Sequence, residues 1–300
     1  MELIVHQNIA DLYRALNLPI AQDLDFTIHF LPDIHRELPF RSPIFRAEYF
    51  SFVFVKTGRG TYTIDNHQFP FEAHTIYFTN PGHIKGFAIE EMENAYIITL
   101  TEAFLRENVH PDIFEEFPFL LAETVPPKVL SEAAFANFED LYLQIFKEFK
   151  QTSRFKNKIL GNLFVVLLLK IKAQFWQAYN PLEEGDRSSQ IVKSFKYLLE
   201  KQFTDMDALS NEQLFQVQDY ARQLQLHPNY LTHVIKSKTG KTVNQWISQR
   251  MISTAKSLLK NTQLSAKEIA FRLGFNQATH FNRFFKKHTA MTPLSFRKTQ

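Results

Sequence analysis

The chain of 300 residues contains no cysteine. This absence excludes disulfides, thiolate metal sites and cysteine nucleophiles. Long hydrophobic runs are also lacking: the apolar stretch Ile159–Ile171 is too short to cross a bilayer and contains Asn162 and Lys170, so we expect a buried helix there. The first residues include acids and lack the layout of a secretory signal. We therefore expect a cytoplasmic protein with no membrane partner.

Acidic residues are scarce in the C-terminal part. Residues 1–186 hold 16 Lys+Arg and 25 Asp+Glu, a net charge of −9, whereas residues 187–300 hold 18 and 6, a net charge of +12. From Tyr220 to the end there are 14 basic residues and one acid, Glu268. Solvated basic faces normally carry interspersed Glu. This imbalance therefore predicts a nucleic-acid partner.

The N-terminal part reads as β-rich. Between residues 26 and 100, short runs of β-branched and aromatic residues alternate with turn residues, which predicts an antiparallel barrel or sandwich. Alternation divides residues 50–55 into two faces, Phe50, Phe52 and Phe54 on one and Ser51, Val53 and Val55 on the other. Both faces are largely apolar, so we expect an internal strand. The pattern does not say which face borders a pocket and which borders the core.

Helical spacing begins near Ser131. An apolar stripe at steps of three and four consists of Phe135, Phe138, Leu141, Tyr142, Ile145, Phe146 and Phe149. A second helix is expected from about Ser153 to Tyr179. The segment Asn180–Ser189, with Pro, Gly and mixed charge, reads as a linker. We therefore predict one domain over residues 1–180, including a helical segment at 131–180, and another over 190–300.

Two short helices joined by a tight turn are predicted twice in the basic part. In the first pair, residues 217–224 precede a helix that starts at Pro228 and ends near Gly240. In the second pair, Ser265 and Glu268 form a capping box. The outward positions of the second helix in each pair are Asn229, Thr232, His233 and Lys236, and then Thr279, Asn282, Arg283 and Lys286. Such side chains suit base edges and phosphates.

The two outward sets lie 50 residues apart, which indicates an internal repeat of a helix-turn-helix. The first helices match at an offset of 49, so the second turn is one residue longer. A linking helix over Val243–Lys260 would span about 25 Å. If the two outward faces point the same way, one chain could enter successive major grooves about 34 Å apart.

These residues resemble the arabinose-regulator (AraC/XylS) family of bacterial transcription factors. The motifs that carry the resemblance are LHPNYLTHVIKSKTGKT, IAFRLGF, FNRFFKK, the linking-helix pattern from Arg250 to Leu259, and an ending with Thr292-Pro293 and Phe296-Arg297. Ala290 departs from the pattern, because the family usually has Gly there. The resemblance covers about residues 190–300 closely.

The resemblance implies roles for individual residues. Base reading would fall to Asn229, Thr232 and His233 in the first unit, with Tyr230 and Lys236 nearer the backbone. The matching positions in the second unit are Ala278, Thr279, Asn282 and Arg283, followed by Lys286. The cluster of Phe281, Phe284 and Phe285 is expected to be core, because it lies opposite the polar stripe.

The N-terminal part is similar to the cupin-type sensor that often precedes this DNA-binding unit, through a Gly-rich turn at Gly58–Gly60 and the stretch Asn80–Phe87. The expected fold class is thus α+β: an antiparallel cupin-like barrel with a helical segment, then an all-α domain of two helix-turn-helix units joined by a linking helix. Candidate effector-binding residues are His29, Arg46, Glu48 and Tyr49. Scattered histidines at 67, 74 and 83 lack the His-x-His pair of metal cupins, so we expect no metal and no cofactor.

The resemblance implies duplex DNA, an unidentified small-molecule effector, RNA polymerase and a second copy of the chain as candidate partners. Residues 131–180 resemble the family's dimerisation segment, although their apolar surplus could equally be buried against the barrel. The expected function is a ligand-responsive regulator that binds specific DNA sequences and is not an enzyme. Alternatives are a metal-dependent cupin enzyme with an accessory DNA module and a non-specific architectural protein. The absence of cysteine excludes a cysteine-based DNA repair protein.

Overall fold

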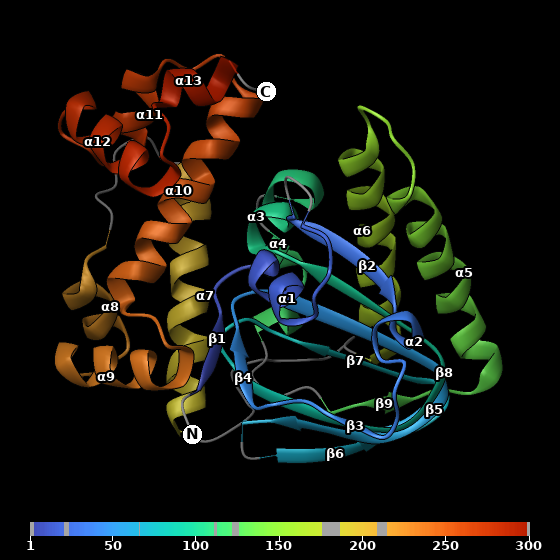
Figure 1. Ribbon diagram of the computed structural model, residues 1–300. Helices are drawn as coiled ribbons and strands as arrows, with labels where there is room; N and C mark the ends of the chain where they lie inside the picture. Colours follow the sequence, from blue (N-terminus) through green and yellow to red (C-terminus); the bar gives the residue numbers. More distant parts are fainter. Residues whose placement is uncertain are drawn as a thin grey trace. The chain divides into compact units, whose positions relative to one another are not determined.

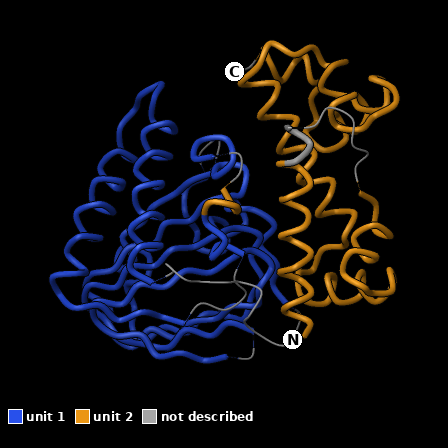
Figure 2. Tube along the Cα trace, turned by 180° about the vertical axis from the view of Figure 1, so that it is seen from behind, with its two compact units in different colours: residues 1–110, 117–181 blue, residues 111–116, 182–300 orange. Residues whose placement is uncertain are grey.

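The computed structural model describes residues 3–20, 24–65, 67–110, 113–121, 126–175, 187–208 and 215–298, without the side chains of 205–208. The chain divides into two compact units (Figure 2). The first comprises Met1–His110 and Phe117–Pro181, and the second comprises Pro111–Glu116 and Leu182–Gln300. The end of the helix expected to reach Tyr179 and most of the expected linker lie outside the described residues. In the part of the chain that is described, no helix is long and apolar enough to cross a membrane.

The first unit is built on a nine-stranded sheet (Figure 1). Its strands are β1 (Ile4–His6), β2 (Phe26–Phe30), β3 (Phe40–Arg41), β4 (Phe45–Ala47), β5 (Phe50–Ile64), β6 (His67–Phe71), β7 (Thr75–Thr79), β8 (Ile84–Leu100) and β9 (Lys128–Val129). Its helices are α1 (Ile9–Ala15), α2 (Leu31–Ile34), α3 (Glu102–Phe104), a π-helical turn (Leu105–Val109), a 3-10 turn (Pro118–Leu121), α5 (Glu132–Phe149) and α6 (Lys156–Phe175).

The long strands β5 and β8 form the centre of the sheet, and the main path runs β1-β4-β8-β5-β7-β9. Pairing is antiparallel as expected, except that β1 runs parallel to β4. Among the described strands, no pairing joins the end strands β1 and β9, so closure into a barrel is not observed. The first unit is therefore a mixed α+β structure with an open path of strands.

The expected turn at Gly58–Gly60 is wrong, because β5 continues through it. The pairing with β8 shifts register between Arg59 and Gly60, which marks a bulge within the strand. A Cβ atom at Gly60 would lie 2.2 Å from the Ala88 carbonyl oxygen, so the glycine permits close backbone approach. Glycine therefore serves a bulge here and not a hairpin.

The internal position expected for the strand that follows Tyr49 is confirmed, since β5 pairs with β7 on one side and β8 on the other. Its phenylalanine face packs on the helices: Phe52 lies 5.0 Å from Phe164 of α6 and Phe54 lies 5.1 Å from Tyr142 of α5, measured between ring centroids. Five of the seven residues of the expected α5 stripe are buried, and Phe146 and Phe149 are partly buried. The other face of β5, with Ser51 and Val53, points away from these two helices.

The second unit is helical. It contains α4 (Ile113–Glu116), α7 (Arg187–Ala208), α8 (Val217–Gln223), α9 (Pro228–Thr239), α10 (Val243–Asn261), α11 (Ala266–Arg272), α12 (Ala278–Thr289) and α13 (Pro293–Lys298). Two differences from the expected boundaries appear. Residues 187–189, assigned to the linker, begin α7, and residues 111–116 cluster with this unit. No pattern in the sequence could reveal the second, since it depends on contacts distant in the chain.

The predicted repeat is confirmed in the helix boundaries. Helices α9 and α12 are both 12 residues long and start 50 positions apart, and α8 and α11 are both 7 residues long and start 49 apart. The turn of the first pair occupies residues 224–227 and that of the second 273–277, one residue more. The Ser265–Glu268 capping box is present. Helix α10 packs against α9, α11 and α13.

The residues that end the two equivalent helices differ in a testable way. Gly240 and Ala290 both adopt left-handed backbone, with φ of 76° and 60°. Because a Cβ atom is unfavourable there, Gly240→Ala should lower the free energy of unfolding by about 1 kcal/mol, whereas Ala290→Gly should raise it by about 0.5 kcal/mol. Urea unfolding of both variants measures this. Equal effects in the same direction would contradict the assignment.

Candidate nucleic-acid interface and internal cavities

Helix α9 separates a buried face from an exposed one. Leu231, Val234 and Ile235 are buried, whereas Asn229, His233 and Lys236 are exposed and Thr232 is partly exposed. Tyr230 is 42% exposed. The helix starts at Pro228 and is capped by the His227 ring, whose Nδ1 accepts a hydrogen bond from the Asn229 amide at 3.3 Å. The outward set thus forms one accessible polar stripe.

Helix α12 repeats this division with a more basic stripe. Its outward residues Thr279, Asn282, Arg283 and Lys286 are all exposed, and Ala278 at its start is partly buried. On the opposite side Phe281 and Phe285 are fully buried, while the partly buried Phe284 ring lies 5.4 Å from Phe275. This arrangement confirms that the phenylalanines pack inside and do not form a stacking platform for bases.

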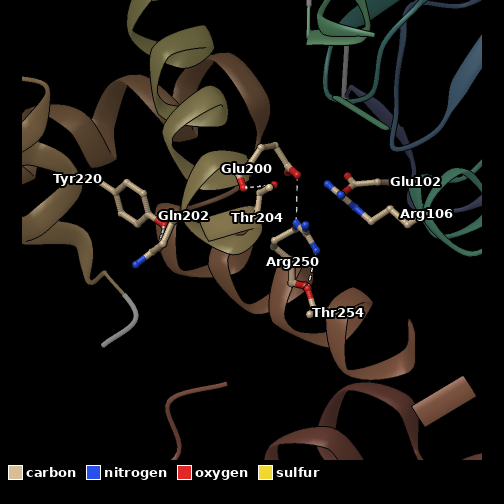
Figure 3. Close-up of polar contacts among 8 residues, drawn as sticks. All are labelled: Glu102, Arg106, Glu200, Gln202, Thr204, Tyr220, Arg250 and Thr254. Carbon is tan, nitrogen blue, oxygen red and sulfur yellow. Dashed lines mark hydrogen bonds and ion pairs between the residues drawn. The ribbon is translucent and has the colours of Figure 1, made fainter. Parts of the chain in front are cut away.

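Both helix pairs are fixed to a frame of α7 and α10, which sequence reasoning did not include beyond the linking helix. Figure 3 shows Arg250 of α10 and Glu200 of α7 pointing toward one another, with Nε and Oε2 3.1 Å apart. The guanidinium also donates to Thr254, and it lies over the Phe203 ring. On α7, Gln202 accepts a hydrogen bond from the Tyr220 hydroxyl of α8.

The frame also holds the end of α9, because the Trp246 indole donates to Thr239 Oγ1 at 3.1 Å. Figure 1 shows α8 and α9 near one end of α10, and α11, α12 and α13 near the other. The two helices that carry the stripes therefore share one hydrophobic core, which contains buried residues of both pairs and of α10.

The electrostatics of this surface are uniform. From Val217 onward the only acids are Asp219 and Glu268, and each carboxylate caps its own helix by accepting from the backbone of Gln216 or Ser265. The hydrogen bonds from Ser265 lower the pKa of Glu268. Within the described ranges, no ion pair involves the cations of the two stripes, Lys236, Arg283 and Lys286. These positive charges are therefore available to a polyanion.

The first unit contains two adjacent internal cavities, of about 180 and 70 Å³. They share part of their lining, including Ser51 of β5 and Ile97 of β8. Of the four candidate effector-binding residues, His29 and Tyr49 line the larger cavity, whereas Arg46 and Glu48 line neither. Ser51 and Val53 line the smaller cavity. The Ser51 face of β5 therefore borders the pocket, and the phenylalanine face borders the core.

Paired polar groups lie in the wall of the larger cavity. The Tyr13 hydroxyl and His29 Nε2 are 2.6 Å apart, and His6 Nδ1 and the Tyr49 hydroxyl are 3.0 Å apart. Burial lowers the pKa of both His6 and His29, which favours their neutral forms near pH 7. The wall of this cavity is otherwise mainly apolar.

Sequence reasoning missed Lys85, which lines the smaller cavity. Lys85 is 4% exposed, and its Nζ donates to Thr79 Oγ1 at 2.6 Å. Strand alternation could have found it, because Lys85 shares a face with Phe87 and Ile89, both of which line the same cavity.

The three histidines considered for metal binding have different surroundings. His83 Nδ1 is 2.8 Å from Asp65 Oδ2, the His74 ring packs 5.4 Å from Phe135, and His67 is exposed. Among the residues the structure describes, no group of three or more His, Asp or Glu side chains could hold a metal ion.

Comparison with known proteins gives three kinds of match. A family model described as a helix-turn-helix domain matches residues 220–299. The arabinose operon regulatory protein of Salmonella typhimurium is 24% identical over 80% of this chain and 80% of its own length. The transcriptional activator RhaR of an Enterobacter species is 26% identical over 59% of each chain. The solved C-terminal domain of the response regulator AraT from Geobacillus stearothermophilus is 28% identical, over 38% of this chain and 89% of that one, with a TM-score of 0.34.

The domain match falls on the segment that holds the repeated helix pairs, and the arabinose and rhamnose regulators align beyond it. Residues 220–299 are therefore a helix-turn-helix domain, and the similarity to the arabinose and rhamnose regulators supports an AraC-family transcriptional regulator.

Proposed function

We propose that the chain binds specific sequences of double-stranded DNA and regulates transcription in the cytoplasm in response to a small molecule. The repeat carries this proposal: two equal helices, 50 residues apart, present exposed polar stripes from a single core. Helices α9 and α12 enter successive major grooves, about 34 Å apart along one face of the duplex. One chain then reads two adjacent half-sites.

Individual roles follow from chemistry and exposure. In α9, Asn229, Thr232 and His233 contact base edges, while Tyr230 and Lys236 contact the backbone. In α12, Thr279, Asn282 and Arg283 contact bases, Ala278 contacts a thymine methyl group, and Lys286 contacts a phosphate. Every one of these residues is exposed or partly exposed, which supports their access to DNA.

Selection from random duplex DNA with the full chain tests the proposal. Enrichment of a site with two conserved segments about one helical turn apart is the expected outcome. Recovery of unselected sequence with equal affinity would contradict it and would favour a non-specific architectural protein.

The residue with the largest expected share of specificity is Arg283. Its guanidinium can donate two parallel hydrogen bonds to guanine, so Arg283→Ala should cost about 1–3 kcal/mol at one base pair and relax preference there. Arg283→Lys is the matched control, because it keeps the charge and loses the fork. Competition binding with single-base variants of the selected site measures both. A uniform loss at all sequences, rescued by Lys, would instead indicate a phosphate contact.

The first unit is proposed to close into a cupin-like barrel that senses the effector, supported by the two internal cavities. The domains are proposed to cover residues 1–180 and 190–300. Residues 131–180 are proposed to form the interface of a homodimer. The exposed apolar residues on α5 and α6 support this: Leu143, Ile159, Val166 and Leu169. Sedimentation of the full chain at the monomer mass alone would contradict the dimer. RNA polymerase is the proposed downstream partner, and the regulator has no catalytic activity.

A further inference from the structure

Lys85 is a buried lysine on a strand of the sheet, which is unusual. Placing an ammonium group away from water is costly unless enough partners compensate it. An ammonium has three donors, and Thr79 Oγ1 is the one hydrogen-bond acceptor of Lys85 Nζ among the described residues. The centroid of the Tyr49 ring lies 5.7 Å from Lys85 Nζ. Lys85 therefore retains donor capacity at the cavity it lines.

A second buried donor faces the same cavity. Tyr62 is 3% exposed, lines the smaller cavity, and its hydroxyl has no hydrogen-bond partner in the described structure. In the β5–β8 register Tyr62 lies opposite Phe87, so Tyr62 and Lys85 are diagonal neighbours on one face of the sheet. Buried polar groups without partners are rare and indicate a missing acceptor.

The rest of the lining defines what the acceptor belongs to. Among the residues that the structure describes, Lys85 is the only Lys, Arg, Asp or Glu side chain that lines either cavity. Three hydroxyls, on Ser51, Thr79 and Thr99, lie side by side on β5, β7 and β8 and border the two cavities. The remaining wall is mainly aliphatic and aromatic, with residues such as Leu12, Leu16, Ile34 and Phe40 in the larger cavity, and its other polar groups include the Tyr13–His29 and His6–Tyr49 pairs. One end of the space is cationic and the other is apolar.

We propose that the effector is an apolar monocarboxylate whose carboxylate accepts hydrogen bonds from Lys85 and Tyr62 and whose apolar body occupies the larger cavity. This inference rests on the proposed function of the first unit as a sensor. A carboxylate has two oxygens and so can satisfy both donors, and its charge compensates the buried ammonium. A neutral alcohol offers a single oxygen and no charge, and an amine would place a second cation beside the first.

Neighbouring charges do not fill this role. The Asp65 carboxylate is already engaged by His83 Nδ1 at 2.8 Å and by the Ile84 amide at 3.1 Å, and neither Asp65 nor Glu48 lines either of the two cavities. Burial lowers the pKa of Lys85 to about 7 although both carboxylates act to raise it. A bound carboxylate would restore the charged form.

Calorimetric titration of the full chain with octanoate, octan-1-ol and octylamine tests the proposal. Octanoate should bind at one site per chain, and at least about tenfold more tightly than octan-1-ol or octylamine, since hydrogen bonds to a charged group are the stronger ones. Equal affinity for octanoate and octan-1-ol, tighter binding of octylamine, or no octanoate binding at millimolar concentration would each overturn it.

Variants locate the site. Lys85→Met should weaken octanoate binding by about tenfold or more and leave octan-1-ol binding unchanged, and Tyr62→Phe should act in the same direction with a smaller loss. Lys158→Met, at an exposed position of α6, is the matched control and should change neither. Unchanged octanoate affinity in Lys85→Met would overturn the assignment, and circular dichroism of each variant checks folding.

Selection of duplex DNA with the same protein preparation distinguishes a failure of the proposed ligand class from a failure of the proposed function. If the chain selects a DNA site yet does not bind octanoate, the ligand class is wrong and the regulator stands. If it binds octanoate through Lys85 but selects no DNA site, the ligand class stands and the proposed function fails.

Discussion

Raising the salt concentration from 50 to 200 mM should weaken the binding of the full chain to its selected duplex by about 10²–10³-fold. The basic stripes of α9 and α12 contain no carboxylate, and beyond Val217 both acids are engaged as helix caps. If about five phosphates are neutralised, counterion release gives a slope of about −4.5 in a plot of log K against log salt. A change of this size exceeds what any single contact contributes.

Fluorescence anisotropy at several salt concentrations measures the slope directly. The double variant Lys236→Ala and Lys286→Ala removes one cation from each stripe and should reduce the magnitude of the slope by about 2. A variant of equal charge change away from the stripes, Lys158→Ala with Lys128→Ala, should leave it unchanged. A binding constant that is insensitive to salt would contradict contact between these stripes and phosphates.

Replacing Lys85 by methionine should make the first unit more stable at pH 7. The pKa of Lys85 is lowered from 10.5 to about 7, and desolvation by burial is the largest cause. Between these two values the unfolded chain binds more protons than the folded one, so the wild type gains stability as the pH rises through this window. The variant lacks this dependence. Its advantage should be about 3–4 kcal/mol at pH 7 and less than about 1 kcal/mol at pH 10.

Urea unfolding at both pH values, followed by near-ultraviolet circular dichroism of the tyrosines, measures this advantage. Lys158→Met should show no comparable difference between the two conditions. A destabilised Lys85→Met protein with the same deficit at pH 7 and pH 10 would show that the lysine is fully compensated without a ligand. A buried charge that costs stability in the absence of a partner is what a binding site for an anion requires.

Local patterns in the sequence predicted the second unit well because its helices are short and amphipathic. The spacing of Leu231, Val234 and Ile235 against the outward polar set determines which side of α9 is buried, and the 50-residue offset transfers the same argument to α12. The role of α7 could not be predicted in this way. Its ion pair between Glu200 and Arg250 joins positions 50 residues apart with no shared motif.

The first unit was less predictable because strand pairing is a long-range property. Glycines near residue 58 suggested a turn, since glycine serves both turns and bulges and only the partner strand distinguishes them. Arg46 and Glu48 were candidates by residue type, but neither lines either of the two cavities described above. Lys85 was overlooked because a lone lysine in an apolar strand is read as solvent-facing until its neighbours on the same face are known.

The two stripes repeat in tandem along one chain, but they are chemically unequal: α9 offers amide, hydroxyl and imidazole groups, and α12 adds an arginine. A tandem arrangement has no dyad, unlike a pair of identical subunits facing each other. The DNA segment that one chain reads should consequently be non-palindromic, and turning that segment around in a promoter would reverse the polarity of the bound chain with respect to the start of transcription.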